Sequence, residues 1–214
     1  MEGICTPDHV REILDHKAPH RRELYDACLA GDTETAKRIL TDHDLTESDL
    51  GAFNNSAFKF ACVGGHLETA QWIAEKCKLT RATPCVREAM LTASGIGHLP
   101  MARWLATHYD LWPRDARAEK CLSVACMSGH LDMAKWLARH YQITRDDIVK
   151  DGEGFAIFAA CHSGDLNTIK WLVTHYSITM EDLCQVPAVG GKTPYKTATE
   201  HADIREWLKK HFES

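Results

Sequence analysis

The stretch FKFACVGGHLETAQWI, residues 58–73, decides the architecture of this chain, because its landmarks recur along the sequence. Related stretches occupy residues 91–105, 124–137 and 158–172, each with a pair of small residues, a turn glycine followed by His or Asp, and a Trp seven positions after that glycine. The turn glycines are Gly31, Gly65, Gly97, Gly129 and Gly164, at spacings of 34, 32, 32 and 35 residues. Periods of this length are typical of helix-turn-helix repeats. The sequence therefore predicts an array of units that bury their apolar faces against one another.

The composition is that of a soluble, folded chain. Of its 214 residues, 44% are hydrophobic and 26% are charged, and the net charge is −5. An acidic balance without long runs of Lys and Arg argues against nucleic acid as a partner. The first ten residues, MEGICTPDHV, do not resemble a signal peptide, and no apolar stretch reaches the length of a membrane span. We expect a cytoplasmic protein, acting in its own cell or in a host cell, with no membrane contact.

Nine cysteines raise the question of disulfides or zinc. Cys28, Cys62, Cys126 and Cys161 each stand three residues before a turn glycine, so the repeat pattern predicts that they are small, reduced core residues. The chain has no Cys-x-x-Cys pair, and its repeated histidines would lie in rows about 10 Å apart, too far to share one ion. We therefore expect no metal and no cofactor.

The segments between repeats predict short helices. Residues 44–50, 142–148 and 177–183 each place a Thr three residues before an Asp, which is a variant of the capping box that opens a helix. Residues 112–115 fill the same slot with Pro at the first helical position, and residues 80–84 are the weakest copy. We expect one-turn helices in these places and an almost wholly helical chain.

The two ends differ from the repeats. Thr6-Pro7-Asp8 predicts the start of a capping helix that reaches about His16, so residues 1–19 are assigned to an N-terminal capping helix and residues 20–184 to the repeats. Residues 185–214 are assigned to a C-terminal capping repeat, because two residues are missing between its Ala198 and its Trp207. Array ends need such polar caps.

The pattern AxxGHLExAxWL resembles the second half of an ankyrin repeat, in a tryptophan-bearing divergent variant like those of amoebae and their large viruses. The resemblance implies an all-α, ankyrin-like helical repeat solenoid of about five to six helix-turn-helix units with terminal caps. It also implies a role in binding proteins. The usual Thr-Pro-Leu-His opening is replaced by residues 56–59, Ser-Ala-Phe-Lys, and only residues 191–195 come close to it. The β-hairpin finger of the family is replaced by the helix starts described above.

The repeated Trp and His have structural interpretations. We expect each Trp to pack in the core between units, which makes Arg38, at the Trp position of the first repeat, a mark of the array's end. The His after each turn glycine is expected to bond neighbouring backbone groups, and the His near the end of each second helix to complement the helix dipole.

The function predicted is that of a non-catalytic scaffold or adaptor, and we expect a monomer that binds another protein. The alternative is an enzyme that uses Cys and His in the groove of the solenoid, although no catalytic motif is present. In ankyrin-like arrays the partner face is the concave row of first helices. That resemblance predicts nine partner-binding residues: Tyr25, Leu29, Lys59, Val63, Leu91, Ile96, Met127, Phe158 and His162. The row is apolar enough for an interface, unless the inter-repeat helices cover it and make it core.

Overall fold

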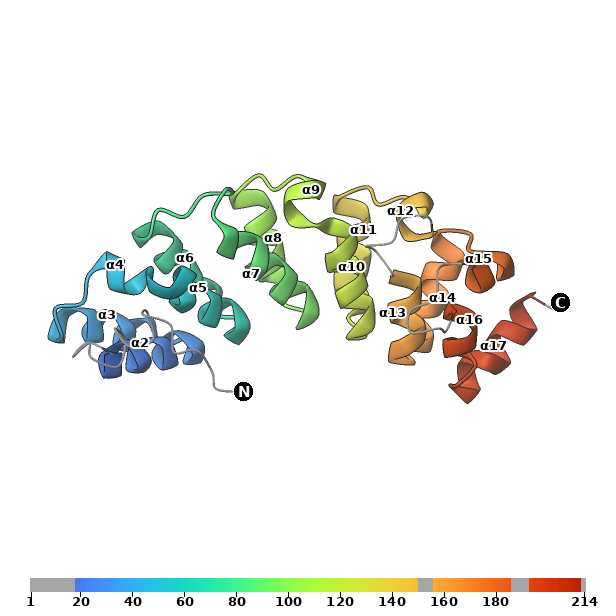
Figure 1. Cartoon of the computed structure of the whole chain (residues 1–214), viewed down its shortest axis with the longest axis horizontal. Helices are drawn as coiled ribbons and strands as arrows, with labels where there is room; N and C mark the ends of the chain where they lie inside the picture. Colours follow the sequence, from blue (N-terminus) through green and yellow to red (C-terminus); the bar gives the residue numbers. More distant parts are fainter. Residues whose placement is uncertain (1–17, 150–155, 186–192, 213–214) are drawn as a thin grey trace, which may run out of the picture. The chain divides into compact units, whose positions relative to one another are not determined.

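A computed structural model describes residues 18–149, 156–185 and 193–212 of the chain. These residues form α-helices and no strand, as the sequence predicts (Figure 1). The helices are α2 (Ala18–Ala30), α3 (Thr33–Asp42), α4 (Glu47–Leu50), α5 (Ala52–Gly64), α6 (Leu67–Lys76), α7 (Pro84–Gly95), α8 (Leu99–His108), α9 (Pro113–Ala116), α10 (Ala118–Met127), α11 (Leu131–His140), α12 (Arg145–Val149), α13 (Ala156–Ser163), α14 (Leu166–His175), α15 (Met180–Gln185), α16 (Pro194–Ala198) and α17 (Ala202–Phe212).

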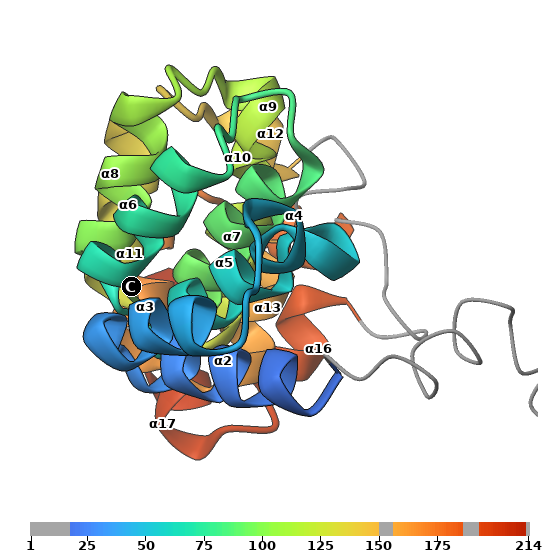
Figure 2. The same ribbon diagram turned by 90° about the vertical axis from the view of Figure 1, so that its left-hand side faces the viewer.

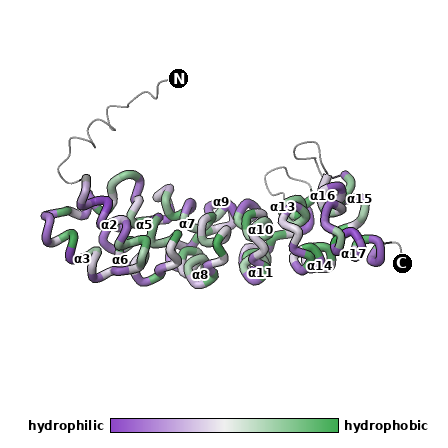
Figure 3. The backbone as a smooth tube through the Cα atoms, turned by 90° about the horizontal axis from the view of Figure 1, so that it is seen from below, coloured by the Kyte–Doolittle hydropathy of each residue, from purple (hydrophilic) through white to green (hydrophobic). Residues whose placement is uncertain are grey.

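The helices divide into two compact units, residues 1–89 and 90–214. Within the described part of each unit, the long helices come in antiparallel pairs such as α2/α3, α5/α6, α10/α11 and α13/α14. In each unit the first helices of the pairs lie on one side and the second helices on the other (Figure 3). At the N-terminal end of the first unit, α2 packs beside both α3 and α5 (Figure 2). The predicted helical repeat architecture is confirmed.

Glycine ends the first helix of each repeat for a conformational reason. The five turn glycines have φ between +73° and +76°, the left-handed region in which a side chain strains the backbone. After Gly65, for example, the amide of His66 donates to the carbonyl of Ala61 at 2.9 Å, so the reversal satisfies a carbonyl at the end of α5. The glycine positions are thus the points where each helix pair turns.

The second helices end in a left-handed residue as well, but that residue is never glycine. Asp44, Lys78, Asp110, Gln142 and Ser177 all have φ near +50°. The next residue is always Leu or Ile, and its amide donates back into the helix, as Leu111 does to Ala106 at 3.0 Å. This is the Schellman pattern, in which the apolar residue after the left-handed one packs on the helix it has left.

The predicted inter-repeat helices are present as α4, α9, α12 and α15. In α4 the capping box is complete, since the amide of Thr46 donates to Asp49 Oδ2 at 2.9 Å and the amide of Asp49 to Thr46 Oγ1 at 3.4 Å. Equivalent reciprocal bonds join Thr144 with Asp147 and Thr179 with Asp182. The weakest copy, residues 80–84, forms no separate one-turn helix: the chain makes a turn there, and its last residue, Pro84, begins α7.

The core of each unit consists of apolar and small side chains from both helix rows. The four cysteines that precede turn glycines are buried and reduced, as predicted. Large buried side chains such as Phe58 and Ile73 fill the first unit, and Met101, Leu122 and Leu137 do so in the second. Small residues such as Ala61 and Cys62 allow neighbouring first helices to approach closely.

The prediction that the Trp residues are core is wrong. Trp72, Trp104, Trp136, Trp171 and Trp207 are all partly exposed. Four of these indoles stack on the His four residues later in the same helix, as Trp136 does on His140 with ring centroids 4.9 Å apart. For Trp136, the aromatic residue after that His, Tyr141, packs edge-on against the indole. The indole therefore covers the end of its own helix, because positions i and i+4 share one helical face.

The role predicted for the turn histidines also needs correction. His66, His98 and His130 stand at helix N-caps, but their side chains make no capping hydrogen bond. Instead, the ring of His66 lies against Gly31 of the preceding repeat, where a Cβ on the glycine would overlap Nδ1 of the ring. His130 lies in the same way against Gly97. His66 and His130 therefore each make a contact between repeats, and that contact needs the glycine of the preceding repeat, which has no side chain in the way.

The predicted N-terminal capping helix lies outside the described residues. At the other end, α16 and α17 form a shortened pair joined without glycine, with His201 against Gly164 in the position of a turn histidine. Glu206, Lys209 and Lys210 are exposed on α17. A polar last helix is what a terminal repeat requires, and the assignment of residues 185–214 as a cap remains our proposal.

Candidate protein-interaction site

Eight of the nine residues predicted to bind a partner lie on the first helices, Ile96 follows the end of α7, and none of the nine is buried. Leu29, Val63, Ile96, Met127 and His162 are exposed, and Tyr25, Lys59, Leu91 and Phe158 are partly exposed. The inter-repeat helices pack at the N-terminal ends of the first helices, as α4 does on α5 and α9 on α10. They therefore leave the predicted row uncovered, and the alternative that they bury it is wrong.

In the first unit, α2 and α5 present one apolar cluster. Tyr25 of α2 meets Phe60 of α5 with ring centroids 5.7 Å apart. Leu29 lies one turn after Tyr25, and Val63, 45% exposed, lies one turn after Lys59, so these side chains share the exposed faces of the two helices. We call Tyr25, Leu29, Phe60 and Val63 the unit-1 patch. Lys59 borders it and pairs with Glu88 at 3.5 Å.

In the second unit, the corresponding positions on α7, α10 and α13 are also apolar. Met127, the last residue of α10, is 49% exposed, and Ile96 just after α7 is 39% exposed. On α13 the ring of Phe158 stacks on that of His162 with centroids 6.4 Å apart. We call Leu91, Ile96, Met127, Phe158 and His162 the unit-2 patch.

These apolar side chains are exposed although their helices also supply the core. On α10, Leu122 and Cys126 are fully buried while Met127 projects outward, because the helical period places successive residues about 100° apart. Three exposed large side chains, Leu29, Val63 and Met127, stand at the same position, two residues before a turn glycine. Phe60 and Ile96 are exposed at neighbouring positions of the row.

Sequence reasoning missed Phe60. The repeat pattern assigns it to the body of the second repeat, but it is 38% exposed and forms part of the unit-1 patch. The sequence contained a signal that this position is exposed. Five residues before two other turn glycines stand the polar residues Asp26 and Thr92. Two further exposed apolar residues, Phe53 and Trp112, lie by contrast at the inter-repeat segments and not on the row.

The buried cysteines do not offer a nucleophile. Burial raises the pKa of the Cys28 and Cys161 thiols to about 12 and that of Cys121 to about 11. Only the thiolate is a good nucleophile, and these side chains are protonated near neutral pH. Among the described cysteines, only Cys184 is exposed. The groove-enzyme alternative therefore gains no support from these thiols.

Comparison with known proteins points to one family. Residues 122–213 match the family model described as ankyrin repeats in three copies. This part of the chain is therefore similar to ankyrin repeats. The matched segment contains the pairs α13/α14 and α16/α17 and most of α10/α11, somewhat under half of the sequence. A search of curated proteins found no match. The tryptophan-bearing variant suggested by the sequence stays a prediction.

The match bears on the general role. Ankyrin repeats are generic protein–protein interaction modules and the family is generally non-enzymatic, which supports a binding scaffold. Within the described residues, no helix is long and apolar enough to cross a membrane.

Proposed function

We propose that the whole chain is an ankyrin repeat protein, and that it is a non-catalytic adaptor that binds a partner protein through its first-helix row. The observation that carries the proposal is the exposure of large apolar side chains at equivalent first-helix positions in both units. An isolated exposed Leu or Val is ordinary on a protein surface. Apolar and aromatic residues that recur in register and touch one another, as Tyr25 and Phe60 do, are typical of an interface core.

The remaining parts of the proposal follow from composition. A net charge of −5 favours a protein partner over nucleic acid. Eight described cysteines are free, which suits a reducing compartment, so we place the protein in the cytoplasm of its own cell or of a host cell. We propose that it acts as a monomer, because the repeats stack on one another within a single chain.

Site-specific photo-crosslinking tests the proposal even though the partner is unidentified. A photoreactive residue replaces Val63 in one version of the full chain and Met127 in another, and crosslinked proteins are identified by mass spectrometry after expression in cells. The matched control carries the same group at Trp112, which is 64% exposed but lies off the row. We expect a common protein crosslinked from Val63 and Met127 and absent from the Trp112 control.

Substitution then measures the contribution of the row. The double variant Leu29→Ser/Val63→Ser removes two exposed side chains of the unit-1 patch. Each substitution that removes a hot spot of about 1 kcal/mol or more should weaken binding of the identified partner at least fivefold. The unfolding midpoint should change little because both side chains are exposed. Equal crosslinking from Trp112, or unchanged affinity of the double variant, would move the interface away from the first helices.

A further inference from the structure

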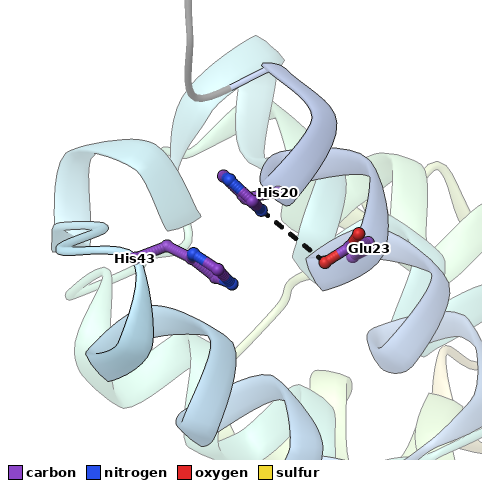
Figure 4. Close-up of side chains that lie close together, drawn as sticks. All are labelled: His20, Glu23 and His43. Carbon is purple, nitrogen blue, oxygen red and sulfur yellow. Dashed lines mark ion pairs between the residues drawn. The ribbon is translucent and has the colours of Figure 1, made fainter.

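One cluster of metal-binding side chains lies outside the repeat register. His20 and Glu23 are three residues apart on α2, so they share one helical face. His43 is the C-cap of α3. The packing of α2 against α3 brings the three side chains together at the N-terminal end of the first unit (Figure 4). Sequence reasoning considered only the histidines that recur with the repeat, and it therefore missed this group.

The three side chains converge at short distances. One potential ligand atom from each of His20, Glu23 and His43 lies within 4.8 Å of the other two. The two imidazole rings are stacked, with centroids 3.6 Å apart and planes 9° from parallel. His20 Nδ1 is 3.7 Å from Glu23 Oε2, which is beyond hydrogen-bond distance.

A second observation concerns the ring nitrogen of His20. The Nδ1 atom of His20 is buried and has no hydrogen-bond partner among the described residues. A buried polar atom without a partner costs free energy that a ligand can recover. The imidazole nitrogen of His is a common metal ligand, and two such rings lie face to face here.

Two imidazoles and one carboxylate are the ligand set of zinc and of related first-row transition-metal dications, whereas Mg²⁺ and Ca²⁺ prefer oxygen ligands alone. We propose that His20, Glu23 and His43 bind one such dication, with Zn²⁺ as the reference case. Bonds of about 2.0–2.2 Å need donor atoms closer together than they now are. Side-chain rotation can supply the closure, since His20 and Glu23 are 34% and 60% exposed at their side chains.

The surroundings favour a cation. Glu23 and His43 also line a groove of about 640 Å³ between α2 and α3. Asp26, Asp32 and Asp42 contribute carboxylates to that groove, and Arg38 is the single basic side chain among the residues that line it. The net negative lining raises the local concentration of cations beside Glu23 and His43.

The bound ion would join the start of α2 to the end of α3. Because such a site exists only in the folded state, binding should stabilise the first repeat and raise the unfolding temperature. The site would lie on α2 and α3 at one end of the array, whereas the unit-1 patch lies on α2 and α5, so the two share only α2. It is independent of the proposed partner interface.

The test is calorimetric titration of the untagged, metal-free full chain with Zn²⁺, together with Co²⁺ absorption spectroscopy. We expect one ion per chain at this site, a Co²⁺ spectrum without a thiolate charge-transfer band, and a higher unfolding temperature with Zn²⁺. His43→Ala and Glu23→Gln should each weaken binding at least tenfold. His140→Ala, which changes an exposed histidine stacked on Trp136 in the other unit, should bind as the parent chain does.

Three results would overturn the proposal: no binding of Zn²⁺ or Co²⁺, binding that His43→Ala and Glu23→Gln leave unchanged, or a thiolate band that assigns the ion to cysteine. Glu23→Gln keeps the test valid if His43→Ala proves unstable, because Gln preserves the size of the exposed Glu23 side chain and changes only its charge.

Discussion

The contribution of a contact between a turn glycine and the first residue of the next turn can be measured by comparing Gly164 with Gly129. Both glycines have left-handed φ, +76° and +73°, so Ala imposes the same backbone strain at each. They differ in their surroundings. A Cβ at Gly164 would lie 2.6 Å from Cε1 of His201, whereas a Cβ at Gly129 meets nothing nearer than Cβ of Asp165 at 4.0 Å.

The expected losses follow from these distances. Left-handed Ala costs about 1–2 kcal/mol, and the smaller entropy of the unfolded variant returns about 0.4–1 kcal/mol. Gly129→Ala should therefore lower the free energy of unfolding by about 1 kcal/mol. Gly164→Ala adds overpacking against His201, typically 1–3 kcal/mol, for a total of about 2–4 kcal/mol. The two substitutions should differ by about 1–3 kcal/mol.

The assay is urea unfolding followed by far-ultraviolet circular dichroism and by Trp fluorescence, with the single variants and the double variant Gly164→Ala/His201→Ala. Removing the ring should abolish the extra cost, so Gly164→Ala in the His201→Ala background should cost as much as Gly129→Ala does. Equal losses for Gly164→Ala and Gly129→Ala in the parent chain would refute the contact between the histidine and the glycine. A cost at Gly164 that persists without His201 would do the same.

Three further substitutions test other features of the second unit. Ser177→Gly should raise the free energy of unfolding by about 0.5 kcal/mol, because Ser177 holds a left-handed φ of +50° that glycine adopts without strain; a loss of stability in urea unfolding would contradict the Schellman ending of α14. Tyr176→Phe should leave the free energy of unfolding unchanged or raise it by up to about 1 kcal/mol, since burial raises the pKa of Tyr176 to about 12 and its buried hydroxyl has no hydrogen-bond partner among the described residues. A clear loss of stability would show that the hydroxyl has a hydrogen-bond partner. Asp182→Asn should lower the free energy of unfolding by about 1 kcal/mol at neutral pH, because burial alone would raise the pKa of Asp182 but hydrogen bonds from Thr179 and Arg145 lower it overall. The stability that the charged Asp182 adds is present above the ordinary Asp pKa, so the difference between the two proteins should disappear in unfolding curves measured below about pH 4. A difference independent of pH would count against the charged interaction.

Local interactions explain why much of the fold was predictable. A left-handed turn needs glycine, and a Thr three residues before an Asp satisfies the exposed amides of a helix start, wherever the helix later packs. The positions of Gly65 and of Thr46 with Asp49 therefore predicted a turn and a one-turn helix correctly. The copy at residues 80–84 carries Thr83 in place of the Asp, and it forms only a turn.

Contacts between helices were not predictable in this way. The periodic Trp was consistent with a core position, and its partial exposure depends on how far each indole, such as Trp136, lies from the neighbouring helix pair. Likewise, the pattern Gly-His repeats in the sequence, but the fact that His66 rests on the glycine of the preceding repeat follows from the stacking of adjacent units.

The sequence by itself determined the repeat, the helices and their ends, because each depends on residues within one or two turns of one another. Only the tertiary structure decided which of the apolar first-helix residues are exposed, placed Phe60 beside Tyr25, and brought His43 to His20 across two helices. Those relations depend on the distance and rotation between packed helices, which side chains from the whole unit set together.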